Sequence, residues 1–520
     1  MKKKVKVFDT TLRDGTQAEN ISLSAEDKLH IAKKLDEFGI DYIEGGWPGS
    51  NPKDMQFFEL ARKTKFKYAK IVAFGSTKRA KFTVEKDPNI QALIDAGTPT
   101  VSIFGKTWLL HVEKALQITP EKNLELIQES IGYLKKNNRE VVYDAEHFFD
   151  GYKDNAEYAL KTLKIAEKTG ADIIALCDTN GGSLPLEIFE IVSEVKKQIS
   201  IPIGIHAHND SGLAVANTIL AVQAGAEHVQ GTINGYGERC GNANLCEVIP
   251  NLQLKAGYLC IEEDKMEMVA KISRYVSEIA NLNHPNNLPF TGRSAFAHKG
   301  GVHVSAVIKD SNSYEHITPE TVGNKRRVLI SDLSGQSNIR YKAEELEIDI
   351  NAHKEKISEI VQALKEKENQ GYQYEAAEGS LRLLIRKITN DFQEFFTLKG
   401  FRILIEKDEN GEVRSEATVR VDVDGEFEHA AAEGNGPVNA LDKALRKALT
   451  KFYPKIKKMK LSDYKVRVLD AKDATGAKVR VLIDSTNTSG SWGTVGVSEN
   501  IIEASWEALT ESISYYLHKT

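Results

Sequence analysis

The chain has 520 residues, of which 28% are charged and 41% hydrophobic, a composition typical of folded globular proteins. This length predicts two to four domains, and a formal net charge of -5 gives no electrostatic basis for binding nucleic acid. No apolar run is long enough to span a membrane. Three lysines near the N-terminus are not followed by an apolar segment, and the four cysteines form no CxxC pair. We therefore expect a soluble, cytoplasmic protein.

Short apolar segments alternate with amphipathic stretches of helical length through the first half of the chain. Eight segments have the pattern of strands: 5–8, 42–43, 70–73, 100–104, 140–143, 172–176, 203–205 and 228–230. Strict alternation of strand and helix predicts right-handed crossovers and a parallel sheet.

Glycine recurs where a predicted helix meets the next strand, at Gly39, Gly97, Gly170 and Gly225. A glycine just after a helix typically adopts the left-handed conformation, and its repetition indicates one βα unit used many times. Ser24 is placed to cap the first helix.

Two architectures fit eight βα units, a closed (β/α)8 barrel and an open doubly wound sheet. Polar residues at or just after all eight strand ends favour the barrel, whose active face is built from those ends. They are Asp9, Asp14, Glu44, Ser76, Lys106, Asp144, Glu146, Asp178, Thr179, His206, His208 and Asn234.

His206 and His208 are two residues apart on the seventh strand, so both imidazoles face the same side. With Asp14, from the end of the first strand, they form a candidate site for a divalent metal. The alternative is that the two histidines only pack polar groups at a strand end.

Two further features follow strand ends. Arg13, next to Asp14, is placed either to stabilise an oxyanion on a substrate or to form a structural salt bridge. The glycine-rich segment 235–243 follows the eighth strand, where it would approach a phosphate-bearing ligand or form a tight turn.

Three motifs together resemble the acyl-CoA-dependent Claisen-condensing barrels: FDTTLRDGTQ at 8–17, HAHND at 206–210 and GERCGNA at 237–243. This family includes the 2-isopropylmalate, homocitrate and citramalate synthases, and more distantly the 3-hydroxy-3-methylglutaryl-CoA lyases. Segments 42–54 and 74–79 are most similar to the citramalate branch. The resemblance implies that acetyl-CoA and pyruvate condense to (R)-citramalate and CoA, opening a threonine-independent route to isoleucine. The alternatives are a 2-isopropylmalate synthase acting on 2-ketoisovalerate, a lyase, and a non-enzymatic amino-acid sensor.

The resemblance also implies roles for individual residues. Asp14, His206 and His208 match the ligands of Zn²⁺, Mn²⁺ or Mg²⁺, with Asn242 in a fourth position. Arg13 and Glu146 match catalytic residues, Arg13 beside the keto oxygen and Glu146 as an acid–base group. The residues expected to contact the 2-keto acid are Arg13, Asp144, Thr179 and Trp108, and those expected to contact acetyl-CoA are Asn234, Gly237 and Arg239.

Two positions depart from the isopropylmalate branch. His147 stands where that branch usually has Asp, and segment 102–108 ends in Trp108 rather than in a small residue. We expect the indole to exclude keto acids larger than pyruvate; alternatively, it packs beneath its loop.

We expect three domains: a catalytic barrel over 1–275, linker subdomains over 276–372, and a C-terminal α+β regulatory and dimerisation domain over 373–520. In the linker, His303 and Tyr314 match residues credited with catalysis in the neighbouring subunit's active site. Without the resemblance, each would be interpreted as an ordinary surface or core aromatic residue.

The last segment contains an internal repeat. Alternating strands at 418–423 and 478–483 each lead through a turn to a glycine-bearing loop (434–437 and 493–496) and an amphipathic helix, which predicts two ββα halves. Pro437 fits the first position of its helix. The resemblance implies an allosteric domain in a homodimer, with isoleucine as feedback effector; the alternative is a purely structural dimerisation domain.

Overall fold

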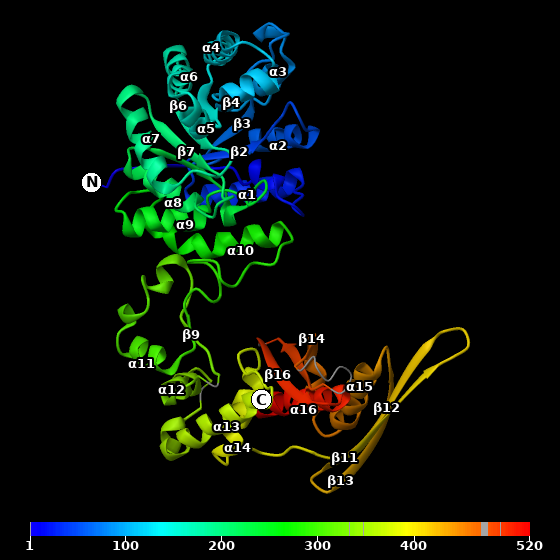
Figure 1. Ribbon diagram of the computed structural model, residues 1–520. Coiled ribbons are helices and arrows are strands. Elements are labelled where there is room, and N and C mark those ends of the chain that lie inside the picture. Colours follow the sequence, from blue (N-terminus) through cyan, green and yellow to red (C-terminus); the bar gives the residue numbers. More distant parts are fainter. Residues whose placement is uncertain (1, 332, 347, 470–476, 489, 520) are drawn as a thin grey trace. The chain divides into compact units, whose positions relative to one another are not determined.

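A computed structural model describes residues 2–331, 333–346, 348–469, 477–488 and 490–519 (Figure 1). The chain forms two compact units. The first runs to Phe296 and includes Ile317–Lys325; the second contains Ala297–His316 and the chain from Arg326 onward. Within the described residues, no helix is both long and apolar enough to cross a membrane.

The first unit is a closed barrel of eight parallel strands in sequence order, in which β1 pairs with both β2 and β8. The predicted (β/α)8 fold is therefore confirmed. The strands are β1 Lys6–Asp9, β2 Tyr42–Gly46, β3 Lys70–Ser76, β4 Thr100–Lys106, β5 Glu140–Glu146, β6 Ile173–Asp178, β7 Ile203–Ala207 and β8 His228–Gly231.

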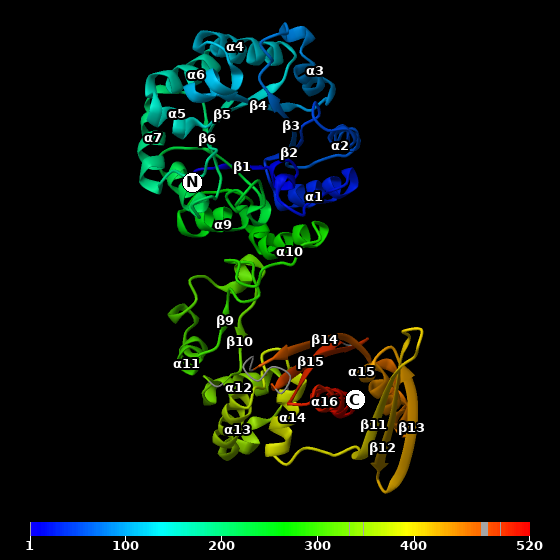
Figure 2. The same cartoon turned by 45° about the vertical axis from the view of Figure 1, so that its right-hand side comes forward.

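Helices surround the ring of strands (Figure 2). Ser24 caps α1 through a capping box with Asp27, and the buried Ile31, Leu35 and Phe38 form its inner face. The helices of this unit are α1 Ala25–Phe38, α2 Pro52–Arg62, α3 Pro88–Asp95, α4 Pro120–Lys136, α5 Phe148–Asp154, α6 Ala156–Thr169, α7 Pro185–Gln198, α8 Ala214–Gln223, α9 Leu245–Pro250 and α10 Val269–Ile279.

The four glycines predicted at helix ends have left-handed φ values of 95° (Gly39), 68° (Gly97), 104° (Gly170) and 115° (Gly225). An L side chain at these positions would strain the backbone, so glycine is the residue that lets each helix turn into the next strand.

The barrel interior is apolar at one end and polar at the other. A buried cluster of Phe8, Tyr42, Val72, Val142 and Ile173 fills its amino-terminal layer. Because side chains two residues apart share a face, β5 follows Val142 with Asp144 at the carboxyl end. The polar residues therefore converge at the carboxyl ends of the strands.

The second unit begins with small elements. β9 Ala297–His298 and β10 Arg327–Val328 pair in parallel, and α11 Gly301–Lys309 lies between them in the sequence. The helices α12 Gln336–Glu345, α13 Ile357–Asn369 and α14 Glu378–Ile388 follow β10. Glu315 links the segments, since its carboxylate accepts from both Nε and Nη2 of Arg326 at 2.6 Å.

Two repeats of three antiparallel strands and one helix complete this unit. They are β11 Thr397–Lys407, β12 Val413–Val423, β13 Glu426–Gly434 and α15 Pro437–Thr450, then β14 Lys460–Val468, β15 Val479–Asn487, β16 Gly490–Ser498 and α16 Ile501–Lys519. Pro437 is the first residue of its helix, as predicted.

The predicted ββα halves are wrong by one strand each, because β11 and β14 precede the strands that the repeat identified. The predicted glycine loops are also wrong in part: Gly434 ends β13, and Gly493 and Gly496 lie within β16. A Cβ on Gly493 would lie 1.9 Å from the Ala376 carbonyl oxygen, so close packing rather than a turn requires this glycine.

Candidate functional site

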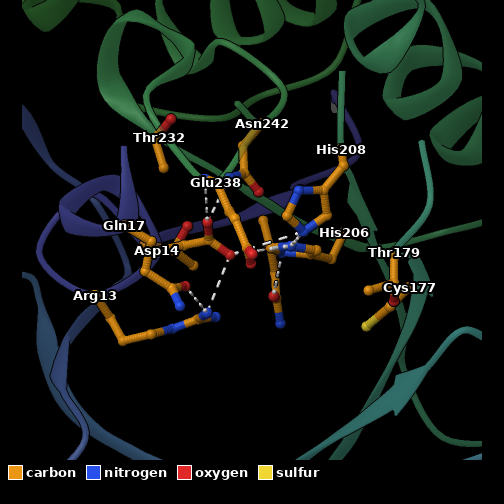
Figure 3. Close-up of polar contacts among 12 residues, drawn as sticks. Arg13, Asp14, Gln17, Cys177, Thr179, His206, His208, Thr232, Glu238 and Asn242 are labelled. Atoms are coloured by element: carbon orange, nitrogen blue, oxygen red, sulfur yellow. Dashed lines mark hydrogen bonds and ion pairs between the residues drawn. The ribbon is translucent and has the colours of Figure 1, made fainter. Parts of the chain in front are cut away.

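Three predicted metal ligands meet at the carboxyl end of the barrel (Figure 3). His206 lies near the end of β7, His208 follows its last residue, and Asp14 begins a short 3-10 turn after β1. The Nε2 atoms of the two histidines are 3.2 Å apart. Asp14 Oδ2 lies 3.7 Å from His206 Nε2 and 3.8 Å from His208 Nε2. All three side chains are buried. Their lone pairs therefore converge on one small volume.

A buried hydrogen-bonded chain orients His206. Gln230 donates from Nε2 to Asp144 Oδ1 at 2.9 Å, which turns its Oε1 toward His206 Nδ1 at 3.0 Å. Ser102 Oγ donates to the other Asp144 oxygen at 2.5 Å. Because Gln230 Oε1 only accepts, His206 carries its proton on Nδ1 and presents the lone pair of Nε2 to the cluster.

Asn242 completes the cluster. Its Nδ2 donates to Asp14 Oδ1 at 2.9 Å, while its buried Oδ1 has no hydrogen-bond partner within the described part of the chain. Gly237 passes so close that a Cβ there would lie 2.1 Å from Asn242 Nδ2. Two imidazoles, a carboxylate and an orphaned carboxamide oxygen form a donor set that fits a divalent cation.

The protonation of these groups also suits a cation. Burial raises the pKa of Asp14, but Arg13 and the two imidazoles outweigh it and hold the pKa well below its usual range. Burial lowers the pKa of His206 to about 3 and also lowers that of His208. The cluster therefore presents an ionised carboxylate and neutral imidazoles near neutral pH.

Arg13 is held between two carboxylates and a ring. Its Nη1 donates to Asp14 Oδ2 at 3.0 Å, its Nε donates to Glu44 Oε2 at 2.6 Å, and its guanidinium carbon lies 3.9 Å from the Phe74 ring centroid. Arg13 therefore forms the structural salt bridge that was one interpretation of its position. The same salt bridge holds its positive charge beside the metal cluster, as the other interpretation, stabilisation of an oxyanion, requires.

Glu44 is completely buried, and its Oε1 has no hydrogen-bond partner among the described residues. Burial acts to raise its pKa, and the adjacent Arg13 guanidinium opposes that rise. Burial likewise raises the pKa of Asp144 to about 6. Carboxyl groups so far from water need donors, and Arg13 and Gln230 supply them.

The cluster opens into a cavity of about 190 Å³. One wall consists of Trp47, Phe74 and Phe104, whose rings contact one another with centroids 5.5 to 5.6 Å apart. The polar lining is Arg13, Asp14, Gln17, Asp144, Glu146, Cys177, Thr179, His206, His208, Gln230 and Glu238. The cavity is small and apolar on one side, and carries charged groups on the other.

Several predicted site residues line this cavity. The Glu146 carboxylate forms an ion pair with Lys106. The Thr179 hydroxyl accepts a hydrogen bond from the His147 backbone N–H at 2.9 Å. The backbone carbonyl of Thr179 accepts one from Arg239 Nη2 at 2.7 Å. Arg239 also forms two bonds to Asp210, at 2.7 and 2.9 Å.

Two predicted residues make other contacts in this structure. Trp108 does not line the cavity: its ring stacks on His111 with centroids 5.2 Å apart, and its Nε1 donates to Asp154 at 3.1 Å. The Asn234 amide is used to hold its loop to α10, through Ser273 and Ser277. Both lie in loops beyond a strand end, where the alternation of side chains no longer predicts direction.

His303 and Tyr314 belong to the second unit. Their rings stack with centroids 4.3 Å apart and an interplanar angle of 26°, and both side chains are largely exposed. Two residues singled out separately in the sequence thus form one surface pair.

Sequence reasoning missed three features of the site: the buried Glu44 as a partner of Arg13, Gln230 as a partner of His206, and the aromatic wall. Each residue lies in a barrel strand, with the exception of Trp47, which follows β2. The signal was available for Gln230, a polar side chain in a fully buried strand.

Comparison with known proteins agrees with this geometry. Residues 4–276 match the HMGL-like family, 290–372 the homocitrate synthase post-HMGL domain-like family, and 375–517 the LeuA allosteric (dimerisation) domain. An (R)-citramalate synthase from Geobacter sulfurreducens is 57% identical, covering 99% of this chain and 98% of that protein. One from Aquifex aeolicus is 54% identical, covering 100% and 99%. A 2-isopropylmalate synthase from Methanocaldococcus jannaschii is 32% identical, covering 99% and 95%. On this full-length similarity, the chain belongs to the (R)-citramalate synthase family.

Proposed function

We propose that this protein condenses acetyl-CoA with pyruvate to give (R)-citramalate and CoA. The observation that carries the proposal is the buried Asp14–His206–His208 cluster beside an oriented Arg13, facing a cavity of about 190 Å³. This is the arrangement needed to activate the ketone of a small 2-keto acid. Membership of the (R)-citramalate synthase family supports the same reaction.

A divalent ion held by Asp14, His206, His208 and Asn242 would polarise the keto oxygen of pyruvate. Arg13 would then donate a hydrogen bond to the alkoxide that develops on that oxygen. Its two carboxylate partners, Asp14 and Glu44, hold the guanidinium in place before substrate binds. No reorganisation is then needed as charge develops.

Glu146 is our candidate for the proton transfers. Its carboxylate lines the cavity and is held by Lys106. It would accept a proton from the acetyl-CoA methyl group, directly or through water, so that the methyl carbon attacks the ketone. Hydrolysis of the thioester then releases CoA. Thr179 and Asp144 remain candidates for positioning the keto acid, and Gly237 and Arg239 for contacting acetyl-CoA.

His303 and Tyr314 would complete the site from a second subunit. Their exposed, stacked rings form a ready contact surface, and the match to the LeuA dimerisation domain supports a homodimer. We retain the proposed division into 1–275, 276–372 and 373–520.

We assign feedback by isoleucine to a cavity of about 710 Å³ in the second unit. Asp442 and Arg446 line it together with the apolar Val438, Ile456 and Leu461. Burial raises the pKa of Asp442 despite its ion pair with Arg446, at 2.8 Å, so an ammonium group would find a poorly solvated carboxylate there. We further propose that the protein is a cytoplasmic enzyme and that it opens a threonine-independent route to isoleucine.

The deciding experiment measures CoA release with pyruvate and with 2-ketoisovalerate, before and after removal of metal with a chelator. We expect kcat/KM to favour pyruvate by well over tenfold and turnover to require a divalent ion. Preference for 2-ketoisovalerate would instead identify a 2-isopropylmalate synthase. Full activity without metal would exclude the mechanism.

A further inference from the structure

The second unit contains a large polar cavity that the proposed reaction does not use. It has a volume of about 850 Å³ and lies between the α13–α14 region and the ends of β14 and β15. Its charged lining consists of Lys299, Lys365, Arg467 and Arg480, together with Glu368 and Glu375. Among the described residues, four cationic groups against two carboxylates leave this lining positively charged.

Two of the cations are neighbours on adjacent strands of the sheet. Arg467 on β14 is paired directly with Arg480 on β15 in the antiparallel register. Val481 is buried against the core, so Arg480 lies on the opposite face of its strand. Side chains paired in this way have Cβ atoms about 5 Å apart, and like charges at that distance destabilise the sheet. Burial, followed by the repulsion from Arg467, lowers the pKa of Arg480.

The carboxylates nearby offset only part of this charge: Glu368 acts to raise the pKa of Arg480, against the larger effects of burial and of Arg467. Glu375 forms an ion pair with Lys299 at 2.5 Å. Arg480 itself bonds neutral groups, donating from Nε to the Gly371 carbonyl at 2.5 Å and from Nη1 to Gln373 Oε1 at 2.7 Å. These bonds pin one guanidinium against the α13–α14 turn, with the second guanidinium opposite.

We propose that this cavity binds a small molecule bearing a phosphoanhydride group, as free nucleotides and CoA both do. Paired guanidinium groups match phosphate oxygens in geometry as well as charge, and Lys365 on α13 supplies a further cation from the other wall. The excess positive charge requires more than a single negative charge on the ligand. A diphosphate meets this requirement within the available volume.

Calorimetry on the full-length protein at low salt tests the proposal, with inorganic pyrophosphate as the minimal probe. Arg467→Gln and Lys365→Gln remove cations that make no hydrogen bond or ion pair with the described residues, so neither should disturb the fold. We expect Arg467→Gln to weaken pyrophosphate binding about 10- to 100-fold. The matched control is Arg420→Gln, an exposed strand arginine outside the cavity, which should bind as the unmodified protein does.

Separate titrations with ADP and with CoA distinguish a nucleotide from CoA as the ligand of this cavity. Whichever compound binds there should bind more weakly to Arg467→Gln and equally well to Arg420→Gln. Citrate tests whether charge alone suffices. Citrate binding as tight as pyrophosphate binding, or pyrophosphate binding unchanged in the Arg467→Gln, Lys365→Gln double variant, would overturn the proposal. Any heat from extraction of metal at the barrel is common to all variants. Since no turnover is measured, the result is independent of the proposed reaction.

Discussion

Gln230 links the metal cluster to the barrel interior, because it accepts from His206 and donates to Asp144. Replacing it with Leu keeps a side chain of similar size but leaves His206 without the acceptor that selects its tautomer. We expect Gln230→Leu to lower metal affinity about 10- to 100-fold, measured by titration of metal into the chelator-treated protein.

The comparison with His206→Ala separates orientation from ligation. Activity of Gln230→Leu should recover as metal concentration is raised, whereas that of His206→Ala or Asp14→Ala should not, although circular dichroism should show that all three remain folded. If Gln230→Leu bound metal as tightly as the unmodified protein, the hydrogen-bonded chain would have no role in the site.

His228 predicts how the barrel responds to acid. It is fully buried against Phe8 and Tyr42, with ring centroids 5.2 and 5.9 Å away, and neither ring nitrogen has a hydrogen-bond partner in the described part of the chain. Burial, and then the charge of Lys6, lowers its pKa to about 3, with Glu140 acting in the opposite direction. The folded barrel therefore holds this imidazole neutral.

Stability should fall as the pH is lowered through the range set by this shift. Below about pH 6.5, His228 becomes protonated in the unfolded chain but stays neutral in the folded chain. The free energy of unfolding therefore decreases by about 1.4 kcal/mol for each pH unit between pH 6.5 and pH 3. Urea titrations at pH 7 and pH 5 should show a smaller decrease in His228→Leu. The exposed His30→Gln is the control and should behave as the unmodified protein. An unchanged decrease in His228→Leu would assign acid sensitivity to other groups.

At the scale of single elements, selectivity for small keto acids depends on β3, β4 and the residue that follows β2. Phe104 shares its face of β4 with Ser102, which bonds Asp144 inside the barrel, so its ring points toward the cavity. Phe104→Val should enlarge the cavity. We expect it to reduce the ratio of kcat/KM for pyruvate to kcat/KM for 2-ketoisovalerate by a factor of at least about ten.

Trp108→Ala provides the comparison, because its indole stacks on His111 outside the cavity. We expect it to change the ratio of the two kcat/KM values by less than about threefold, and to destabilise the loop instead. If Trp108→Ala narrowed the preference and Phe104→Val did not, the indole rather than the wall would set substrate size.

The elements themselves differ in how far the sequence predicts them. The eight barrel strands are largely buried on both sides, and four of them follow a glycine at a helix end, so their apolar runs are clear. By contrast, β11 and β14 are edge strands with many exposed positions, and charged residues of both signs, such as Arg402 and Glu406 in β11, obscure their alternation. The two histidines could be predicted as a pair from their two-residue spacing at the end of β7. Asp14 lies beyond the end of β1 and could be placed beside them only because a closed barrel brings its first and last strands together. Trp108 could not be placed, since it lies two residues beyond the end of β4.

At the scale of the whole molecule, regulation requires that a ligand in the second unit alter turnover in the barrel. The cavity lined by Asp442 and Arg446 has opposite charges for the two ends of an amino acid and apolar side chains for its branch. Such coupling is reciprocal for binding, so an effector that weakens substrate binding must itself bind less tightly when substrate is present.

Isoleucine should therefore inhibit the full-length protein and bind to it in calorimetry, and truncation after residue 372 should abolish both effects. Asp442→Asn removes the charge that would hold the ammonium group while keeping the side-chain size, so isoleucine affinity should fall about 10- to 100-fold. Asp422→Asn, a change of the same kind on β12 outside this cavity, should leave the affinity unchanged. Sedimentation of the truncated protein tests dimerisation separately. If the full-length protein bound none of isoleucine, leucine and valine, the C-terminal domain would be left with dimerisation alone.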